Sequence, residues 1–328
     1  MIKLFKTNGL MQIVFIVFAG LILWTPSLIN PPTPTTDISS GPLYVVFCFL
    51  LAKIPLVATI VALLLTLTEG YLLTKLLNDK GLIPLNTLLP MFLYVLAMGF
   101  GVSQQGFSHG VVTNLWIILA LHSMMPDEHL VVPENRIFNT SLWLSMSTIT
   151  YLPCIFLSIP VIIGLLSYKV YKAREWGIAI LGLLAPYIIV GTVLFMTDDL
   201  TLIDDYIKEA VNAIDFNIQW VGWSNIYSIL VGLFFVVLGM FSIANFGTQT
   251  IAQRRHGWVV IGITIYGICT TFYDGFTPVN GQHFAIVAST IGCILLDTPR
   301  PKRIWINDLC LVFIIIAGLY SYYAPLFD

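Results

Sequence analysis

The sequence predicts an all-α fold, a polytopic bundle of transmembrane helices, and three observations lead to this class. Apolar residues make up 58% of the 328 residues and charged residues only 10%. The mean hydropathy is +0.90, and a soluble domain of this size does not bury so much apolar surface. When the apolar runs are threaded through a bilayer, all Lys and Arg residues except Lys53 and Lys208 fall on one side. The chain therefore satisfies the positive-inside rule.

Composition also excludes several classes of function. The net charge of −2 leaves no basic surface for nucleic acid. The sequence contains no phosphate-binding loop, dinucleotide fingerprint or zinc-protease motif, so no cofactor or metal is expected. The five cysteines lie in or beside apolar runs without ligand spacing, which indicates buried small hydrophobic residues.

A spanning helix needs about 20 apolar residues. With Lys3 and Lys6 in the cytoplasm, we expect one integral domain over residues 1–328, retained in a bacterial inner membrane with its N-terminus cytoplasmic. About nine full spans are predicted. They cover residues 10–28, 56–77, 85–102, 111–125, 176–196, 226–246, 258–273, 284–296 and 305–323.

Two segments are expected to lie on the outer surface instead of crossing. Residues 43–77 are too long for one span and too short for two, and Lys53 and Pro55 interrupt them. We therefore expect an interfacial helix at 43–52 before the span at 56–77. Residues 198–225 are acidic and carry apolar residues at helical spacing, which predicts an amphipathic surface helix.

Residues 137–167 are expected to form a hairpin of two half-length helices. Pro153 divides this apolar run, Arg136 precedes it and Lys169 follows it. A single crossing would place one basic end outside, and two full crossings would need about 40 residues. A hairpin with both ends cytoplasmic and its tip at 151–153 satisfies both the length and the charge.

The stretch 139–199 resembles a family of polytopic inner-membrane proteins of Bacteroidota that is known as a domain of unknown function. The resemblance rests on a tyrosine–proline break, a basic residue beside a glutamate, a glycine, a proline and an outer acidic pair. The matching residues are Tyr151, Pro153, Arg174, Glu175, Gly182, Pro186, Asp198 and Asp199. The resemblance implies a membrane location and no assigned chemistry.

The threading is also similar in architecture to polyprenyl-phosphate-sugar-dependent glycosyltransferases of the GT-C fold. That similarity rests on an outer first loop with Asp37, a surface helix at 43–52 and the half-helix pair at 137–167. It implies a catalytic acid in the first outer loop. This chain departs from the pattern because the loop is short and Asp37 has no acidic neighbour in it.

Six residues are candidates for function. Glu69 lies within a predicted span, where an unpaired charge is costly; it is either a proton, cation or substrate site, or a residue that reaches the interface or pairs with Lys75. Asp37 is a general base or a solvated loop acid. Lys53 holds a lipid phosphate or anchors a helix. Gln105 and His109 lie in a polar outer loop, where they bind substrate or are simply solvated. Tyr151 lies at the tip of the hairpin, beside which a substrate cavity is expected.

Three functions follow from these candidates. The preferred interpretation is that the protein handles a lipid-linked, polyprenyl-phosphate-type substrate at the outer leaflet in envelope biogenesis, with the phosphate near Lys53. Its partners would be membrane lipids and a polyprenyl-phosphate-linked sugar. The alternatives are a transporter with a polar cavity near Glu69 and the 137–167 hairpin, and an accessory or scaffold subunit of a membrane complex. Asp37→Asn should inactivate an enzyme, Glu69 substitutions should inactivate a transporter, and neither should affect a scaffold.

Overall fold

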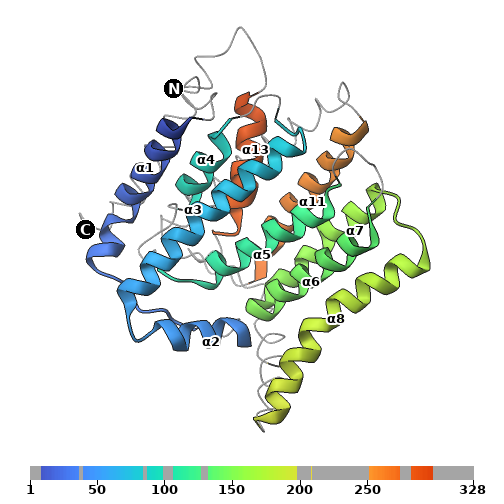
Figure 1. Ribbon diagram of the computed structural model, residues 1–328, viewed down its shortest axis with the longest axis horizontal. Helices are drawn as coiled ribbons and strands as arrows, with labels where there is room; N and C mark the ends of the chain where they lie inside the picture. Colours follow the sequence, from blue (N-terminus) through green and yellow to red (C-terminus); the bar gives the residue numbers. More distant parts are fainter. Residues whose placement is uncertain are drawn as a thin grey trace.

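The computed structural model describes residues 9–36, 40–83, 87–98, 106–126, 132–197, 208, 251–273 and 282–297 (Figure 1). In these ranges the regular structure is helical, apart from one isolated β-bridge between Ser40 and Tyr151. The all-α prediction is therefore confirmed for the described residues. The helices are α1 (Leu10–Ile29), α2 (Pro42–Leu51), α3 (Pro55–Asp79), α4 (Leu89–Met98), α5 (His109–Met124), α6 (Glu134–Thr150), the 3₁₀ helix η2 (Leu152–Leu157), α7 (Ser158–Ser167), α8 (Ala173–Met196), α11 (Ile251–Tyr273) and α13 (Phe284–Asp297).

Three of the described helices, α1, α3 and α8, are long and apolar enough to cross a membrane. They contain 20, 25 and 24 residues, and at about 1.5 Å per residue each covers a hydrocarbon core of about 30 Å. Figure 1 shows α1 and α8 at opposite edges of the bundle. Both expose large apolar side chains, including Phe15, Phe18, Ile188 and Phe195. These features indicate a membrane protein.

Several other predicted spans correspond to shorter apolar helices. Helices α4 and α5 and the segment Leu152–Ser167 contain 10–17 residues, and so does the apolar part of α13, Ala285–Ile294. Helix α11 includes the predicted span at 258–273 and extends back to Ile251, so Arg254 and Arg255 lie in its first described turns. The predicted segments 198–225, 226–246 and 305–323 lie outside the described residues, apart from the single residue Lys208. The count of nine full spans therefore stays a prediction.

The helix predicted at 43–52 is present as α2, which begins at Pro42 and ends at Leu51; its place at the membrane surface stays a prediction. Figure 1 shows it at one edge of the bundle, near the ends of α3 and α6. Its first turn is joined to the end of α6, because the Gly41 amide donates to the Thr150 carbonyl at 2.9 Å. A Cβ atom on Gly41 would lie against the Ile149 carbonyl oxygen. Glycine therefore allows this backbone-to-backbone contact.

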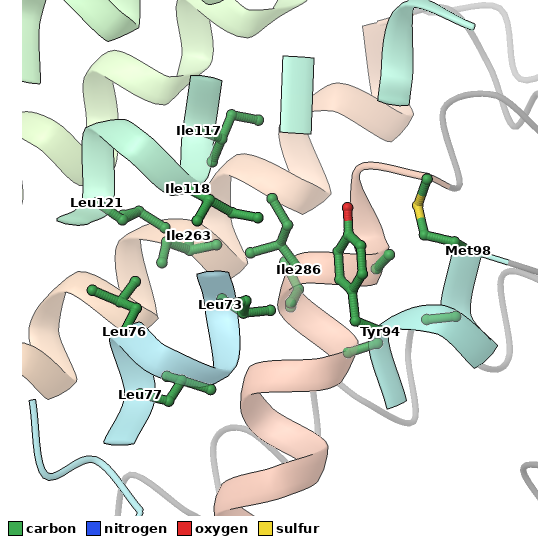
Figure 2. Close-up of a cluster of buried hydrophobic side chains, with 14 of the residues drawn as sticks. Leu73, Leu76, Leu77, Tyr94, Met98, Ile117, Ile118, Leu121, Ile263 and Ile286 are labelled. Atoms are coloured by element: carbon green, nitrogen blue, oxygen red, sulfur yellow. The ribbon is translucent and has the colours of Figure 1, made fainter. Parts of the chain in front are cut away.

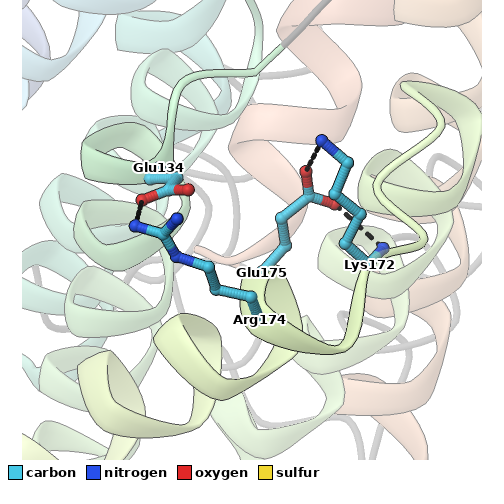
Figure 3. Close-up of polar contacts among 4 residues, drawn as sticks. All are labelled: Glu134, Lys172, Arg174 and Glu175. Atoms are coloured by element: carbon cyan, nitrogen blue, oxygen red, sulfur yellow. Dashed lines mark hydrogen bonds and ion pairs between the residues drawn. The ribbon is translucent and has the colours of Figure 1, made fainter.

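The chain breaks at Tyr151, between α6 and η2, as the sequence predicted. After this break come η2, α7 and the start of α8, where Arg174 lies against Glu134 at the start of α6 (Figure 3). Glu134 in the first turn of α6 and Arg174 in the first turn of α8 form an ion pair, with 3.1 Å between Oε2 and Nη2. The two ends of the segment 134–174 therefore lie together. The limb α6 measures about 25 Å and the limb η2–α7 about 27 Å at standard helical rises, so each limb is longer than half a bilayer core.

Helix α8 packs against α6 along a narrow stripe. Ala179, Gly182 and Pro186 are its buried residues, and a Cβ atom on Gly182 would lie 2.5 Å from the Phe138 carbonyl oxygen. The hydroxyls of Thr148 and Tyr187 are 2.6 Å apart and share a hydrogen bond at the same contact. The rest of α8 is apolar and mostly exposed, as expected for a helix that faces lipid.

Contacts among loops that the threading places in the cytoplasm gather at one end of the bundle. The Arg136 guanidinium donates to the Met125 carbonyl at 3.0 Å, and the Gln253 amide donates to the Gly81 carbonyl at 2.8 Å. After α7, the hydroxyl of Tyr168 lies 2.5 Å from Nδ1 of His256. Burial raises the pKa of Tyr168, so this phenol remains protonated and shares a hydrogen bond with the imidazole.

Candidate functional site

A chain of buried polar side chains crosses the apolar interior from α3 to α5. Glu69 on α3 is wholly buried, and its Oε2 accepts a hydrogen bond from the Tyr94 hydroxyl of α4 at 2.7 Å. The Asn114 amide of α5 donates to the same hydroxyl at 3.0 Å. Tyr94 uses its one donor on Glu69 and accepts from Asn114, so it links the two side chains.

The hydrogen-bonded polar chain of side chains continues toward α13 through Gln282. The Asn114 amide also donates to the Gln282 carbonyl at 3.0 Å, and the Ser108 hydroxyl donates to the Gln282 side-chain oxygen at 2.5 Å. A Cβ atom on Gly110 would lie 2.4 Å from that same side-chain oxygen. The glycine therefore lets Gln282 pack directly against the first turn of α5.

The surroundings of this chain are apolar. Figure 2 shows the Tyr94 ring among aliphatic side chains of several helices, with Leu73, Met98 and Ile286 nearby. Lys75, the residue that could have neutralised Glu69, is exposed. Six residues on a helix turn through about 600°, which places Lys75 about 120° around the helix from Glu69 and therefore on a different face. Among the described residues no ion pair involves Glu69.

A second cluster of rings lies beside the polar chain. The His109 ring of α5 stacks on Tyr151, with 4.0 Å between centroids and 10° between planes. Tyr151 in turn lies 5.3 Å from the His283 ring at 13°. All three side chains are buried. Since His283 follows Gln282 directly, the ring cluster and the polar chain meet at one pair of residues.

Two further tyrosines extend the ring cluster. The Tyr266 hydroxyl of α11 lies 3.3 Å from Nδ1 of His283 and 3.4 Å from the Cys154 sulfur. On the other side Tyr44 of α2 meets the His109 ring edge-on, with 5.8 Å between centroids. The cluster therefore joins five separate parts of the chain.

Four segments meet at the end of the bundle that contains the ring cluster; three were predicted as outer loops, and the other is the predicted tip of the hairpin. They are the first loop with Ser40, the loop before α5, the break at Tyr151 and the turn before α13. The β-bridge between Ser40 and Tyr151 and the ring contacts bring them together. The threading is thus consistent within the bundle, and the choice of which end faces the cytoplasm remains a prediction.

The structure brings together three of the six predicted site residues. Glu69, His109 and Tyr151 belong to the adjoining clusters, whereas Asp37 and Gln105 lie outside the described residues. Lys53 is exposed, and its Nζ lies 5.8 Å from the centroid of the Phe49 ring. Lys53 lies just beyond the end of α2 that is remote from Tyr151. Its described contact is with Phe49 of that helix.

Sequence reasoning missed Tyr94, Asn114, Tyr266 and His283. Asn114 and His283 are polar residues inside or beside predicted spans, and this signal could have singled them out in the same way as Glu69. Tyr94 and Tyr266 gave no such signal, because tyrosine is common in membrane helices and near their ends.

Comparison of the chain with protein-family models, with curated proteins and with solved structures finds no match. The two resemblances drawn from the sequence therefore stay predictions. The geometry of the two adjoining clusters is therefore the basis of the proposed function.

Proposed function

We propose that the protein is a membrane transporter whose polar path runs from the ring cluster at the predicted outer end to Glu69 in the interior of the bundle. The observation that carries this proposal is the complete burial of Glu69 in a helix long enough to span the membrane, hydrogen-bonded to Tyr94. A carboxyl group in such a place is expensive to retain and typically marks an ion or substrate pathway.

The arrangement of the neighbouring groups supports the same conclusion. Tyr94, Asn114 and Gln282 connect Glu69 to the ring cluster by hydrogen bonds. The helix break at Tyr151 exposes backbone groups, which membrane proteins tolerate beside a cavity or under protein cover. Broken helices near buried polar groups are typical of transporter binding sites.

The proposal includes the membrane arrangement expected from the sequence. The bundle lies in a bacterial inner membrane with its N-terminus in the cytoplasm and about nine full spans. The segment at 137–167 enters from the cytoplasmic side and returns to it. The ion pair between Glu134 and Arg174 supports this course, because it joins the two ends of the segment.

The handling of a lipid-linked substrate was the interpretation preferred from sequence, and it stays a prediction. It required Lys53 to face a groove near the tip at Tyr151. The side chain of Lys53 is instead exposed and lies over Phe49. The described geometry favours the path through Glu69, so the transporter becomes the leading proposal.

Charge movement in reconstituted membranes tests the proposal. Purified protein is placed on a solid-supported membrane, and amino acids, sugars, carboxylates and nucleosides are added one class at a time. We expect one class to produce a transient current in the wild type and in Glu134→Gln, and none in Glu69→Gln. Glu134→Gln is the matched control because it makes the same chemical change at an exposed position.

Complementation of a deletion strain can show that the transporter proposal is wrong. If Glu69→Gln restores the wild-type phenotype at normal protein levels while Asp37→Asn does not, the protein is an enzyme and the transporter proposal is wrong. If both variants restore it and no solute class produces a current, the accessory-subunit interpretation replaces it.

A further inference from the structure

Two oxygen atoms in the buried polar chain have no hydrogen-bond partner among the residues that the structure describes. They are Oε1 of Glu69 and Oδ1 of Asn114, and both side chains are fully buried. Both belong to groups that bond the same Tyr94 hydroxyl. A buried acceptor without a donor costs about 1–3 kcal/mol, and native structures rarely leave two of them on groups that bond one hydroxyl without a reason.

The orientation of the Asn114 amide is fixed by its neighbours. Its nitrogen donates to the Gln282 carbonyl and to the Tyr94 hydroxyl, and a carbonyl oxygen can only accept. Reversing the amide would place two oxygens against each other at 3.0 Å. The unpartnered atom is therefore the oxygen, and it requires an electron-poor partner.

The charge at Glu69 also requires neutralisation. A carboxylate that leaves water loses several kcal/mol of hydration unless a positive partner replaces it. Tyr94 supplies one neutral hydrogen bond, and among the described residues no cationic side chain contacts the carboxyl group. An ionised Glu69 would leave one uncompensated negative charge in the apolar interior.

The available atoms indicate which partner fits. Carboxylate, amide and phenol oxygens are hard donors, which suit protons and hard metal cations and not soft metals. Among the described residues no group of three His, Cys, Asp or Glu side chains is placed to hold a metal ion, and a single carboxylate balances a single positive charge. These facts favour one small monovalent cation.

We propose that Glu69 and Asn114 form a binding site for one small monovalent cation, a sodium ion or a proton, held by Oε1 of Glu69 and Oδ1 of Asn114. A sodium ion and a proton each carry one positive charge and each bind oxygen lone pairs. The inference rests on the proposed function for its role, since such an ion would supply the coupling charge of the transporter. The Asn114 amide also donates to the Gln282 carbonyl, and Gln282 precedes His283 of the ring cluster. The ion ligand Asn114 is therefore connected to the ring cluster by one hydrogen bond.

Thermal unfolding of the purified full chain in detergent tests the sodium arm. The probe is sodium chloride, compared with choline chloride at equal ionic strength. If sodium occupies the site, the wild type and Glu134→Gln gain thermal stability with rising sodium, and Glu69→Gln does not. Asn114→Ala keeps the carboxylate and loses one ligand, so its midpoint for sodium should rise by about tenfold or more.

Infrared difference spectroscopy of the same samples tests the proton arm. If a proton occupies the site, a protonated carboxylic acid band titrates reversibly in the wild type and in Glu134→Gln, and it is missing in Glu69→Gln. A band that never titrates would show a permanently neutral, structural carboxyl group. That result, together with no sodium-specific stabilisation, overturns the proposal.

The two proposals can fail separately. Solute-driven currents that depend on Glu69, measured without any sodium or pH response, would retain the transporter and remove the cation site. A sodium-specific stabilisation without currents for any solute class would retain the site and remove the transporter. Glu69→Gln keeps an oxygen that can accept the hydrogen bond from Tyr94, so this variant is expected to fold. Its gel-filtration profile in detergent checks the folding.

Discussion

Arg174 and Glu134 lie forty residues apart in the chain and form an ion pair at 3.1 Å. The pair joins the first turn of α6 to the first turn of α8, and the break at Tyr151 lies between them. The contact shows that the intervening segment leaves one end of the bundle and comes back to it. A segment that crossed a membrane once would separate these two side chains by the thickness of the bilayer.

Cysteine labelling therefore has a definite expected result. Single cysteines at the exposed positions Asn135 and Lys172, introduced into a chain whose native cysteines have been replaced, should react with an impermeant maleimide from the same side of the membrane. The positive-inside rule predicts that this side is the cytoplasm. Reaction from opposite sides would show that the segment crosses the membrane once.

The ion pair itself is expected to contribute little stability. The side chains of Arg174 and Glu134 are 79% and 48% exposed, and water screens such pairs to less than about 1 kcal/mol. Arg174→Gln should therefore lower the free energy of unfolding in mixed micelles by no more than about 1 kcal/mol. A loss several times larger would mean that the pair is buried in the assembled membrane protein.

Two glycines of α8 should respond oppositely to the same substitution. A Cβ atom at Gly177 would meet nothing within 4 Å, whereas one at Gly182 would lie 2.5 Å from the Phe138 carbonyl oxygen. Gly177→Ala should be neutral or stabilising by up to about 1 kcal/mol. Gly182→Ala should destabilise by about 1–3 kcal/mol through steric overlap with α6. Equal effects in an unfolding titration would contradict the packing of α8 on α6.

The hydrogen bond between Tyr94 and Glu69 predicts a measurable cost on removal. Tyr94→Phe leaves the buried carboxyl group without its donor and removes one of the acceptors of the Asn114 amide, so the free energy of unfolding should fall by about 1–3 kcal/mol. Tyr71→Phe on α3 is the control, because Tyr71 is exposed. If both variants unfold alike, Tyr94 does not support Glu69.

The break at Tyr151 was predictable because it follows from local chemistry. Pro153 lacks a backbone donor and disfavours helical geometry just before it, and the basic residues on both sides limit how the segment can be threaded. Helix α2 was predictable for a related reason, since Pro55 ends one apolar run and begins another. The start of α2 at Pro42 also fits the preference for proline in a first helical turn.

The sequence alone determined the helical class and the apolar surfaces of α1 and α8. It also determined that Glu69, within an apolar segment, needs a polar partner. Each depends on the cost of exposing apolar groups to water or placing charge in hydrocarbon, and both costs can be read from residue type and position. The partners of Glu69 were decided only by the tertiary structure. Tyr94, Asn114 and Gln282 lie 25, 45 and 213 positions further along the chain, and only the packing of α3, α4, α5 and α13 brings their polar atoms within hydrogen-bond distance. The sequence shows that a buried charge needs a partner, and the close packing of helices distant in the chain selects which residue supplies it.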